Sequence, residues 1–148
     1  MKTLIVYEST HHKNTYKLVE AIVDKFEVDT INVKDTAAAD LSEYDLIGFA
    51  SGIAFGKFYP EIMAFAKNNL PENKKVFLIY TCGKDSKNYP NAMKALAAEK
   101  DCNVLGCYAS LGYDTFGPFK LIGGISKNHP TDTEISGAVE FFGKIRVC

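Results

Sequence analysis

Hydroxyl and amide side chains gather in one short stretch near the start of the chain, E-S-T-H-H-K-N-T at residues 8–15. The stretch follows an apolar run, residues 4–7, and precedes an amphipathic run that begins near Tyr16. A strand that turns directly into a helix suits an anion, because the first N–H groups of the helix have no partners within it and lie at the positive end of its dipole. The uncharged donors of this stretch are Ser9, Thr10, Asn14 and Thr15.

The chemistry of this stretch favours a phosphomonoester. Neither G-x-x-x-x-G-K-[ST] nor G-x-G-x-x-G is present, and Lys13 is the single cation of the stretch, so a triphosphate with magnesium is disfavoured. His11 and His12 could form a metal pair, but neighbouring side chains diverge in a loop and no third ligand is apparent. We therefore favour a phosphate contact or plain solvation for these histidines.

The elements that must position this stretch alternate along the chain. Apolar runs predict strands at residues 3–7, 45–50, 76–80 and 104–109, and alternation of apolar and polar residues predicts an edge strand at 28–33. Helical spacing predicts helices after the opening stretch, from Pro60, at about 90–100, and from Thr131, which forms a capping box with Glu134. The pattern indicates an α/β fold, a single domain at 1–148 with a parallel five-stranded sheet and helices on both faces.

Three loops in this arrangement leave the carboxyl ends of strands, at residues 9–15, 50–59 and 81–86. Ligands bind beyond the carboxyl ends of such sheets, at the point where the strand order reverses. A small-residue turn after one strand is often purely steric, but three at the same edge favour a ligand site. The long glycine-rich connection at 111–130 is either a functional loop or a misassigned element.

Composition limits the other possibilities. The chain has 148 residues, a net charge of −1 and 47% hydrophobic residues, which is typical of a globular domain and argues against non-specific nucleic-acid binding. No run is long enough to span a bilayer and no signal-peptide pattern is present, so we expect no membrane association and a cytoplasmic location. Cys102 and Cys107 are an odd number of positions apart, so on a regular strand they face opposite sides and cannot ligate jointly without a bulge.

The three loops resemble those of the flavodoxins over the whole chain. S-T-H-H-K-N-T is similar to the S-T-x-G-N-T phosphate loop of that family, A-S-G-I-A-F-G-K-F resembles the second loop of a flavodoxin-like subgroup, and residues 113–130 resemble its long segment after the last strand. The resemblance implies a doubly wound sheet of order 2-1-3-4-5 with FMN at the switch point. It also has two departures: Lys13 replaces a glycine, and tryptophan is absent, which leaves Phe55 as the nearest flank for the flavin.

The resemblance also implies which residues bind FMN. The phosphate contacts would come from the first loop, one side of the flavin from the second and its pyrimidine edge from the third. These residues are Ser9, Thr10, His11, Lys13, Asn14 and Thr15; Ser51, Ile53, Ala54, Phe55 and Gly56; and Thr81, Cys82, Gly83 and Asp85. From the residues alone, we favour a small loop residue over a redox thiol for Cys82. Phe55, Phe58 and Tyr59 could simply pack against the next helix, and we favour that role for Phe58.

Two classes of function follow from the resemblance. The first is an FMN-binding electron-transfer protein with no catalytic acid or base, which would work with a redox partner protein, a reductase or an acceptor enzyme. The alternative is an FMN-dependent oxidoreductase that passes electrons from NAD(P)H to a quinone-type or other small acceptor. The net charge of −1 gives little of the acidic docking face usual in carriers. A third hypothesis is a binding module on the same fold that has lost FMN.

Overall fold

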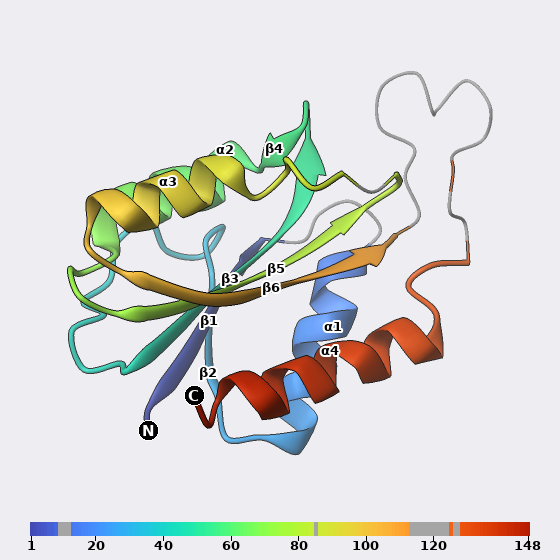
Figure 1. Ribbon diagram of the computed structural model, residues 1–148, viewed down its shortest axis with the longest axis horizontal. Helices are drawn as coiled ribbons and strands as arrows, with labels where there is room; N and C mark the ends of the chain where they lie inside the picture. The colour runs from blue at the N-terminus through green and yellow to red at the C-terminus, as the bar shows by residue number, and fades with distance from the viewer. Residues whose placement is uncertain (9–12, 85, 113–124, 126–127) are drawn as a thin grey trace.

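A computed structural model describes residues 1–8, 13–84, 86–112, 125 and 128–148. One sheet forms the middle layer, with α2 and α3 on one face and α1 and α4 on the other (Figure 1). The strands are β1 (Thr3–Glu8), β2 (Asp29–Asn32), β3 (Leu46–Ala54), β4 (Lys57–Phe58), β5 (Lys75–Cys82) and β6 (Asn103–Leu111). The helices are α1 (Asn14–Lys25), α2 (Pro60–Asn69), α3 (Asn91–Glu99) and α4 (Asp132–Ile145).

The main sheet has the order β2-β1-β3-β5-β6 with every neighbouring pair parallel. Because β4 lies off this path and pairs only with β3, the five parallel strands follow the predicted order 2-1-3-4-5. The predicted flavodoxin-like α/β fold is thereby confirmed. The strand order reverses between β1 and β3, and both strands end at the same edge of the sheet (Figure 1).

Two cores fill the spaces between the three layers. Successive residues of a strand face opposite sides, so Leu4 and Val6 join the core under α2 and α3 while Ile5 joins the core under α1 and α4. The central strands are therefore apolar on both faces, and Ile47, Phe77 and Leu78 are fully buried. No helix in the described part of the chain is long and apolar enough to cross a membrane.

The segment at 51–60, predicted as a loop, is largely a β-hairpin. Strand β3 continues past the expected end at Ala50 to Ala54, and Ala54 pairs with Lys57 in the antiparallel strand β4. The sequence conceals this turn because Phe55, rather than asparagine or glycine, occupies its first central position. The hairpin rises beyond the carboxyl edge of the sheet on the side of α2 and α3 (Figure 1).

A bulge in β6 corrects the prediction for two cysteines. Val76 pairs with Val104 but Phe77 pairs with Gly106, so Leu105 is an extra residue in β6. Cys102, just before the strand, and Cys107 consequently pack against the same core, under α2 and α3. The expectation that they face opposite sides was wrong, because it assumed a regular strand.

The last helix begins as predicted. The side chain of Thr131 accepts a hydrogen bond from the backbone N–H of Glu134, and the Glu134 carboxylate accepts one from the backbone N–H of Thr131 at 2.8 Å. This reciprocal pair satisfies two N–H groups that have no partner within the helix. The predicted capping box is confirmed.

Candidate functional site at the carboxyl edge of the sheet

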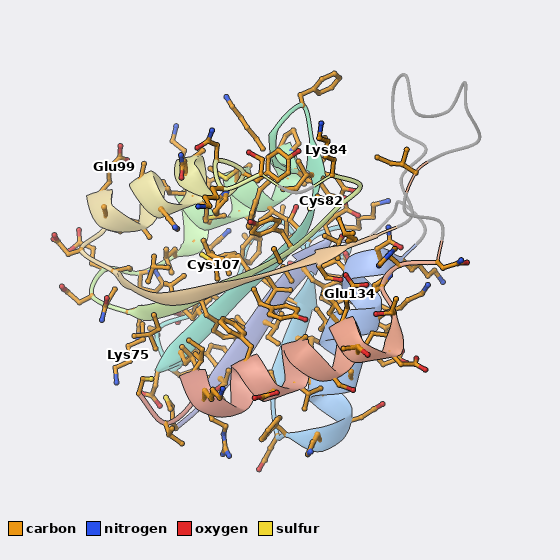
Figure 2. The ribbon with its side chains drawn as sticks, turned by 45° about the vertical axis from the view of Figure 1, so that its right-hand side comes forward. Lys75, Cys82, Lys84, Glu99, Cys107 and Glu134 are labelled. Atoms are coloured by element: carbon orange, nitrogen blue, oxygen red, sulfur yellow. The ribbon has the colours of Figure 1, made fainter. Side chains whose placement is uncertain are left out.

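The strand register brings the three predicted loops to one edge. Glu8, the last residue of β1, lies beside Ser51 of β3, and Gly52 of β3 lies beside Thr81 of β5. Neighbouring strands are about 4.8 Å apart, so the exits of β1, β3 and β5 span roughly 10 Å. In Figure 2, Cys82, Lys84 and Glu134 lie at this end of the molecule, and Lys75 lies at the other.

The start of α1 combines a positive charge with backbone N–H groups that no side chain of the described residues caps. Lys13 occupies the N-cap position with φ 55° and ψ 29°, and no side chain of the described residues makes a capping hydrogen bond there. Asn14 and Thr15 follow in the first turn and are buried. The N-terminus of a helix in this state is a ready anion site.

The backbone conformation of Lys13 explains why the family that this loop resembles usually has glycine at the corresponding position. Its φ of 55° is in the left-handed region, which glycine adopts freely and other L-residues adopt at a cost of about 1–2 kcal/mol. Lys13 keeps the glycine-type turn and adds a positive charge at the helix start. The replacement therefore keeps a glycine-type backbone conformation at this position.

A buried hydrogen bond joins the first predicted loop to the third. The hydroxyl oxygens of Thr15 and Thr81 are 2.8 Å apart, although the two residues are 66 positions apart in the sequence. Beyond Thr81, the backbone N–H of Gly112 donates to the carbonyl oxygen of Cys82 at 2.9 Å. A Cβ atom at Gly112 would be 2.5 Å from Nδ2 of Asn14, so the exit of β6 packs directly against the start of α1.

The second loop presents an aromatic ring at the tip of the hairpin. The side chain of Phe55 is 90% exposed, and Phe55 and Gly56 have φ angles of 53° and 76°. Positive φ at both central residues is what a type I′ turn requires, and asparagine or glycine is favoured at both positions. Phe55 thus combines a strained backbone with an exposed ring, a combination concentrated at functional sites.

Other members of the second loop support the hairpin. The buried hydroxyl of Ser51 accepts a hydrogen bond from the backbone N–H of Tyr59 at 2.9 Å and donates one to the carbonyl oxygen of Gly52 at 2.6 Å. A Cβ atom at Gly52 would be 2.3 Å from the hydroxyl of Tyr59. Both of these hydrogen bonds of the Ser51 hydroxyl are made within the hairpin and its flanks. Ile53 packs against the core under α2 and α3. The sequence reading gave Tyr59 only a packing role and did not select Gly52; a glycine near the end of a buried strand was the available signal for Gly52.

The third loop is only partly described. Thr81 and Cys82 are buried and close strand β5, and Gly83 follows them. The thiol of Cys82 donates to the carbonyl oxygen of Ser110 at 3.8 Å, a long contact that suits a small packing residue. Four predicted site residues lie outside the described residues: Ser9, Thr10, His11 and Asp85.

A pocket of about 660 Å³ lies against the hairpin, and the predicted site residues Ala54 and Phe55 line it. Its volume is in the range of small-molecule sites, and most of its wall is apolar. The remaining described lining residues are Glu8, Lys57, Phe58, Tyr59, Pro60, Glu61, Met63 and Ala92. Phe58 is a buried core residue, in agreement with the packing role predicted for it.

The pocket reveals a charged residue that the sequence reading did not select. Glu8 is only 3% exposed, and its Oε1 is 4.0 Å from Nζ of Lys34. The signal in the sequence was an acidic residue that directly ends an apolar buried strand, since buried carboxylates are uncommon and require partners. The edge therefore contains a buried carboxyl group beside its aromatic residue.

Glu134 fastens both described ends of the connection at 111–130. Its carboxylate accepts hydrogen bonds from the backbone N–H of Leu111 at 3.1 Å and of Thr131, and contacts Nδ1 of His129. Burial raises the pKa of Glu134, but the hydrogen bonds from Thr131, His129 and Leu111 outweigh it and leave the pKa below its usual value. Residues 113–124 and 126–127, most of the predicted connection, lie outside the described residues.

These observations fit FMN. The start of α1, with a cation at its N-cap and no capping side chain among the described residues, suits a phosphomonoester. The exposed ring of Phe55 offers a stacking face, and the adjacent pocket is large enough for a ring system. The Thr15–Thr81 contact holds the phosphate end and the third loop at a fixed separation.

Comparison with known proteins decides the family. A family model for the flavodoxin domain matches residues 4–119. The chain belongs to the flavodoxin domain family. It is also 39% identical over 143 residues to an uncharacterized protein of Methanocaldococcus jannaschii, with 95% of each chain covered.

Solved structures agree with this family. A flavodoxin from the domain Archaea superposes with a TM-score of 0.64 at 19% identity, over 99% of each chain. A flavoprotein from Lactobacillus acidophilus, solved in complex with FMN, has a TM-score of 0.56 at 21% identity, over 73% of this chain and 91% of its own. At these identities the likeness shows the shared fold.

Proposed function

We propose that this flavodoxin-domain protein binds FMN at the carboxyl edge of its sheet and transfers electrons. The observation that carries the proposal is the 2.8 Å contact between the Thr15 and Thr81 hydroxyls, which ties the start of α1 to the third loop. Support comes from the flavodoxin-domain match and from a structural neighbour that was solved with FMN.

Each loop has a separate task in this proposal. The start of α1, with Lys13, Asn14 and Thr15, holds the phosphate, together with the predicted contacts of residues 9–11. Phe55 and Ala54 flank the flavin ring at the hairpin, and residues 81–85 contact its pyrimidine edge. Bound FMN supplies the electron-accepting group, and the protein orients it and limits its contact with water.

Reconstitution tests the proposal. Purified protein incubated with FMN and freed of unbound flavin should retain the flavin absorption bands, and the bound flavin should be protected from quenching by iodide. Protein that elutes colourless after reconstitution would instead support the third hypothesis, a binding module without FMN. A redox partner protein is the expected partner of the holoprotein.

The alternative function is an FMN-dependent oxidoreductase that uses NAD(P)H and a small acceptor. One observation favours it: the net charge of −1 provides little overall attraction for a basic partner. Steady-state NADPH oxidation with menadione separates the two functions. Turnover without an added reductase favours the enzyme, and its absence in FMN-loaded protein favours the carrier.

A further inference from the structure

We propose that the edge strand β6 pairs with β6 of a second copy of this chain, in antiparallel orientation about a twofold axis at Tyr108. The pairing joins the sheets of the two copies into one continuous sheet. The inference goes beyond the proposed function and does not depend on FMN, because it concerns the backbone groups of β6 and the charges beside this strand.

Strand β6 lacks several of the features that usually protect a sheet edge. Among the described strands it pairs only with β5, and residues 104–111 include no charged residue and no proline. All of these residues except Ser110 are partly exposed. The opposite edge strand, β2, is only four residues long and begins with Asp29. Natural sheets protect their edges with charges, prolines and short strands, so the long uncharged edge at β6 favours a partner strand.

Two features limit the part of β6 that can accept a partner. Leu105 forms the bulge near the start of the strand and disturbs regular pairing there. At the other end, the backbone N–H of Leu111 donates to the Glu134 carboxylate at 3.1 Å. A regular stretch at residues 106–110 lies between these two features.

The direction of the backbone groups sets the register of the pair. The N–H of Gly112 donates to the carbonyl oxygen of Cys82 in β5, whereas the N–H of Leu111 is directed away from β5, to Glu134. Because the direction alternates along a strand, the N–H and C=O groups of Ala109 and Cys107 also point away from β5.

Only one antiparallel register uses these groups fully. Centred on Tyr108, it places Cys107 of each copy opposite Ala109 of the other, in pairs that exchange both of their hydrogen bonds. A register centred on Cys107 or on Ala109 would instead require the bulged Leu105 or the N–H of Leu111, which is already bonded to Glu134.

The side chains on both faces of β6 suit this register. The ring of Tyr108 contacts Phe141 of α4 with centroids 5.7 Å apart, and its hydroxyl donates to the carbonyl oxygen of Glu134 at 2.6 Å. In the pair it lies opposite its own copy at the closely spaced, non-hydrogen-bonded position, where aromatic pairs stabilise a sheet. On the other face, a cavity of about 460 Å³ between α3 and β6, lined in part by Gly106 and Cys107, gives room for side chains of the adjoining strand.

The charges on the α3 face favour a second copy in antiparallel orientation. Glu99 lies near the beginning of β6 and Lys84 near its end, with Cys107 between them (Figure 2). Both charged side chains are exposed. A twofold axis brings the beginning of one β6 beside the end of the other, so Glu99 of each copy comes to the same end as Lys84 of the other. A parallel pair would bring like charges together.

The α4 face has the same asymmetry. Helix α4 runs opposite to β6, since Glu134 in its first turn bonds Leu111 and a Cβ atom at Gly106 would be 3.0 Å from Ile145. Its first turn is acidic and its last turn carries Lys144. The twofold axis therefore brings opposite charges together on this face too. Lys94 approaches its own copy near the axis, but it is exposed and solvent screens the repulsion.

Sedimentation equilibrium of the full chain tests the inference, with and without FMN, from about 1 μM to about 1 mM, a range that includes weak interfaces. We expect a reversible dimer. Ala109→Pro removes an N–H that points away from β5, so no hydrogen bond within the sheet is lost. It should raise the Kd of the dimer about tenfold or more, because half of the hydrogen bonds of the pair disappear. Ala109→Val keeps the N–H and should change the Kd less than about threefold.

A cross-link tests the register. In a Cys148→Ser background, which removes an exposed thiol, Ala109→Cys places a thiol opposite the native Cys107 of the second copy. Their Cα atoms would be about 5.5 Å apart, within the range of a disulfide. Oxidation should give a covalent dimer that disappears when Cys107→Ser is added. A protein that dimerises without this cross-link would have another interface, and a chain that stays monomeric up to about 1 mM would have none; either result overturns the inference.

Charge reversal gives a third measurement that leaves β6 itself unchanged, so it decides the question should Ala109→Pro fail to fold. Glu99→Lys and Lys84→Glu, measured without FMN, should each raise the Kd of the dimer about two- to fivefold, and the double variant should return it toward the wild-type value. Single reversals without effect, or a double variant that is weaker than both, would contradict the antiparallel pair.

Discussion

Phe55→Asn tests two properties of the hairpin tip separately: the backbone strain at Phe55 and the contact of its ring with the flavin. Phe55 has φ 53° ahead of Gly56 at φ 76°, and asparagine followed by glycine is the favoured pair for such a turn. The left-handed conformation costs an ordinary L-residue about 1–2 kcal/mol, and asparagine adopts it more readily. Because the ring is 90% exposed, its removal forfeits little burial.

The substitution should therefore stabilise the protein without cofactor. A gain of about 1 kcal/mol raises the Tm of a chain of this length by roughly 2–4 °C. The same substitution removes the stacking face for the flavin, which is worth about 0.5–1.5 kcal/mol, so the Kd for FMN should rise roughly two- to tenfold. Thermal denaturation of the apoprotein and a fluorescence titration with FMN measure the two effects.

Phe55→Tyr is the matched control, since it keeps both the aromatic face and the strained backbone. It should leave the Tm and the Kd close to those of the wild type. A lower apoprotein Tm for Phe55→Asn would show that the ring stabilises the fold. An unchanged Kd would show that Phe55 does not flank the flavin, and either result refutes the reasoning.

Three further predictions concern the start of α1 and the start of α4. Lys13→Gly should leave the free energy of unfolding of the apoprotein within about 1 kcal/mol of the wild type, because relief of the left-handed strain is offset by the greater flexibility of glycine in the unfolded chain. The same substitution should raise the Kd for FMN by a factor that becomes smaller as salt is added. A change in Kd that does not depend on salt would contradict a charge contact between Lys13 and FMN. Thr15→Val should cost about 1–3 kcal/mol in urea denaturation, because it leaves the buried Thr81 hydroxyl without its 2.8 Å partner, and the double variant with Thr81→Val should recover part of this loss. Glu134→Gln should destabilise the protein by about 1–2 kcal/mol at pH 7. The folded-state pKa of Glu134 lies below the usual 4.5, so its stabilisation is complete above that pH and is lost as the pH falls through the lower folded-state value; a difference between the two proteins that stays constant down to pH 3 would exclude this origin.

Local patterns in the sequence predicted most of the architecture. Continuous apolar runs identified β1, β3 and β5 because both faces of these strands are buried, as Phe77 and Leu78 show. The capping box at Thr131 identified the start of α4, because this signal depends on two residues three positions apart. The order of the sheet came from the resemblance to flavodoxins and was confirmed.

The features that were missed depend on an unusual turn residue or on contacts between distant segments. The hairpin at β3 and β4 was predicted as a loop, since its turn uses Phe55 where the local rules favour asparagine or glycine. The bulge at Leu105 depends on the register with β5 and leaves no mark in the composition of β6. The burial of Glu8 likewise depends on its surroundings in the fold, among them Lys34, which is 26 positions away.

Chemical-shift mapping of FMN on isotope-labelled apoprotein tests the central claim most directly, because it reports both binding and location. We predict saturable shifts at a 1:1 ratio, concentrated at residues 13–15, 52–56 and 81–83. Residues of the groove between α1 and α4, such as Ala21 and Val139, should remain unchanged. The absence of saturable shifts, or shifts concentrated in that groove, would contradict an FMN site at the carboxyl edge of the sheet.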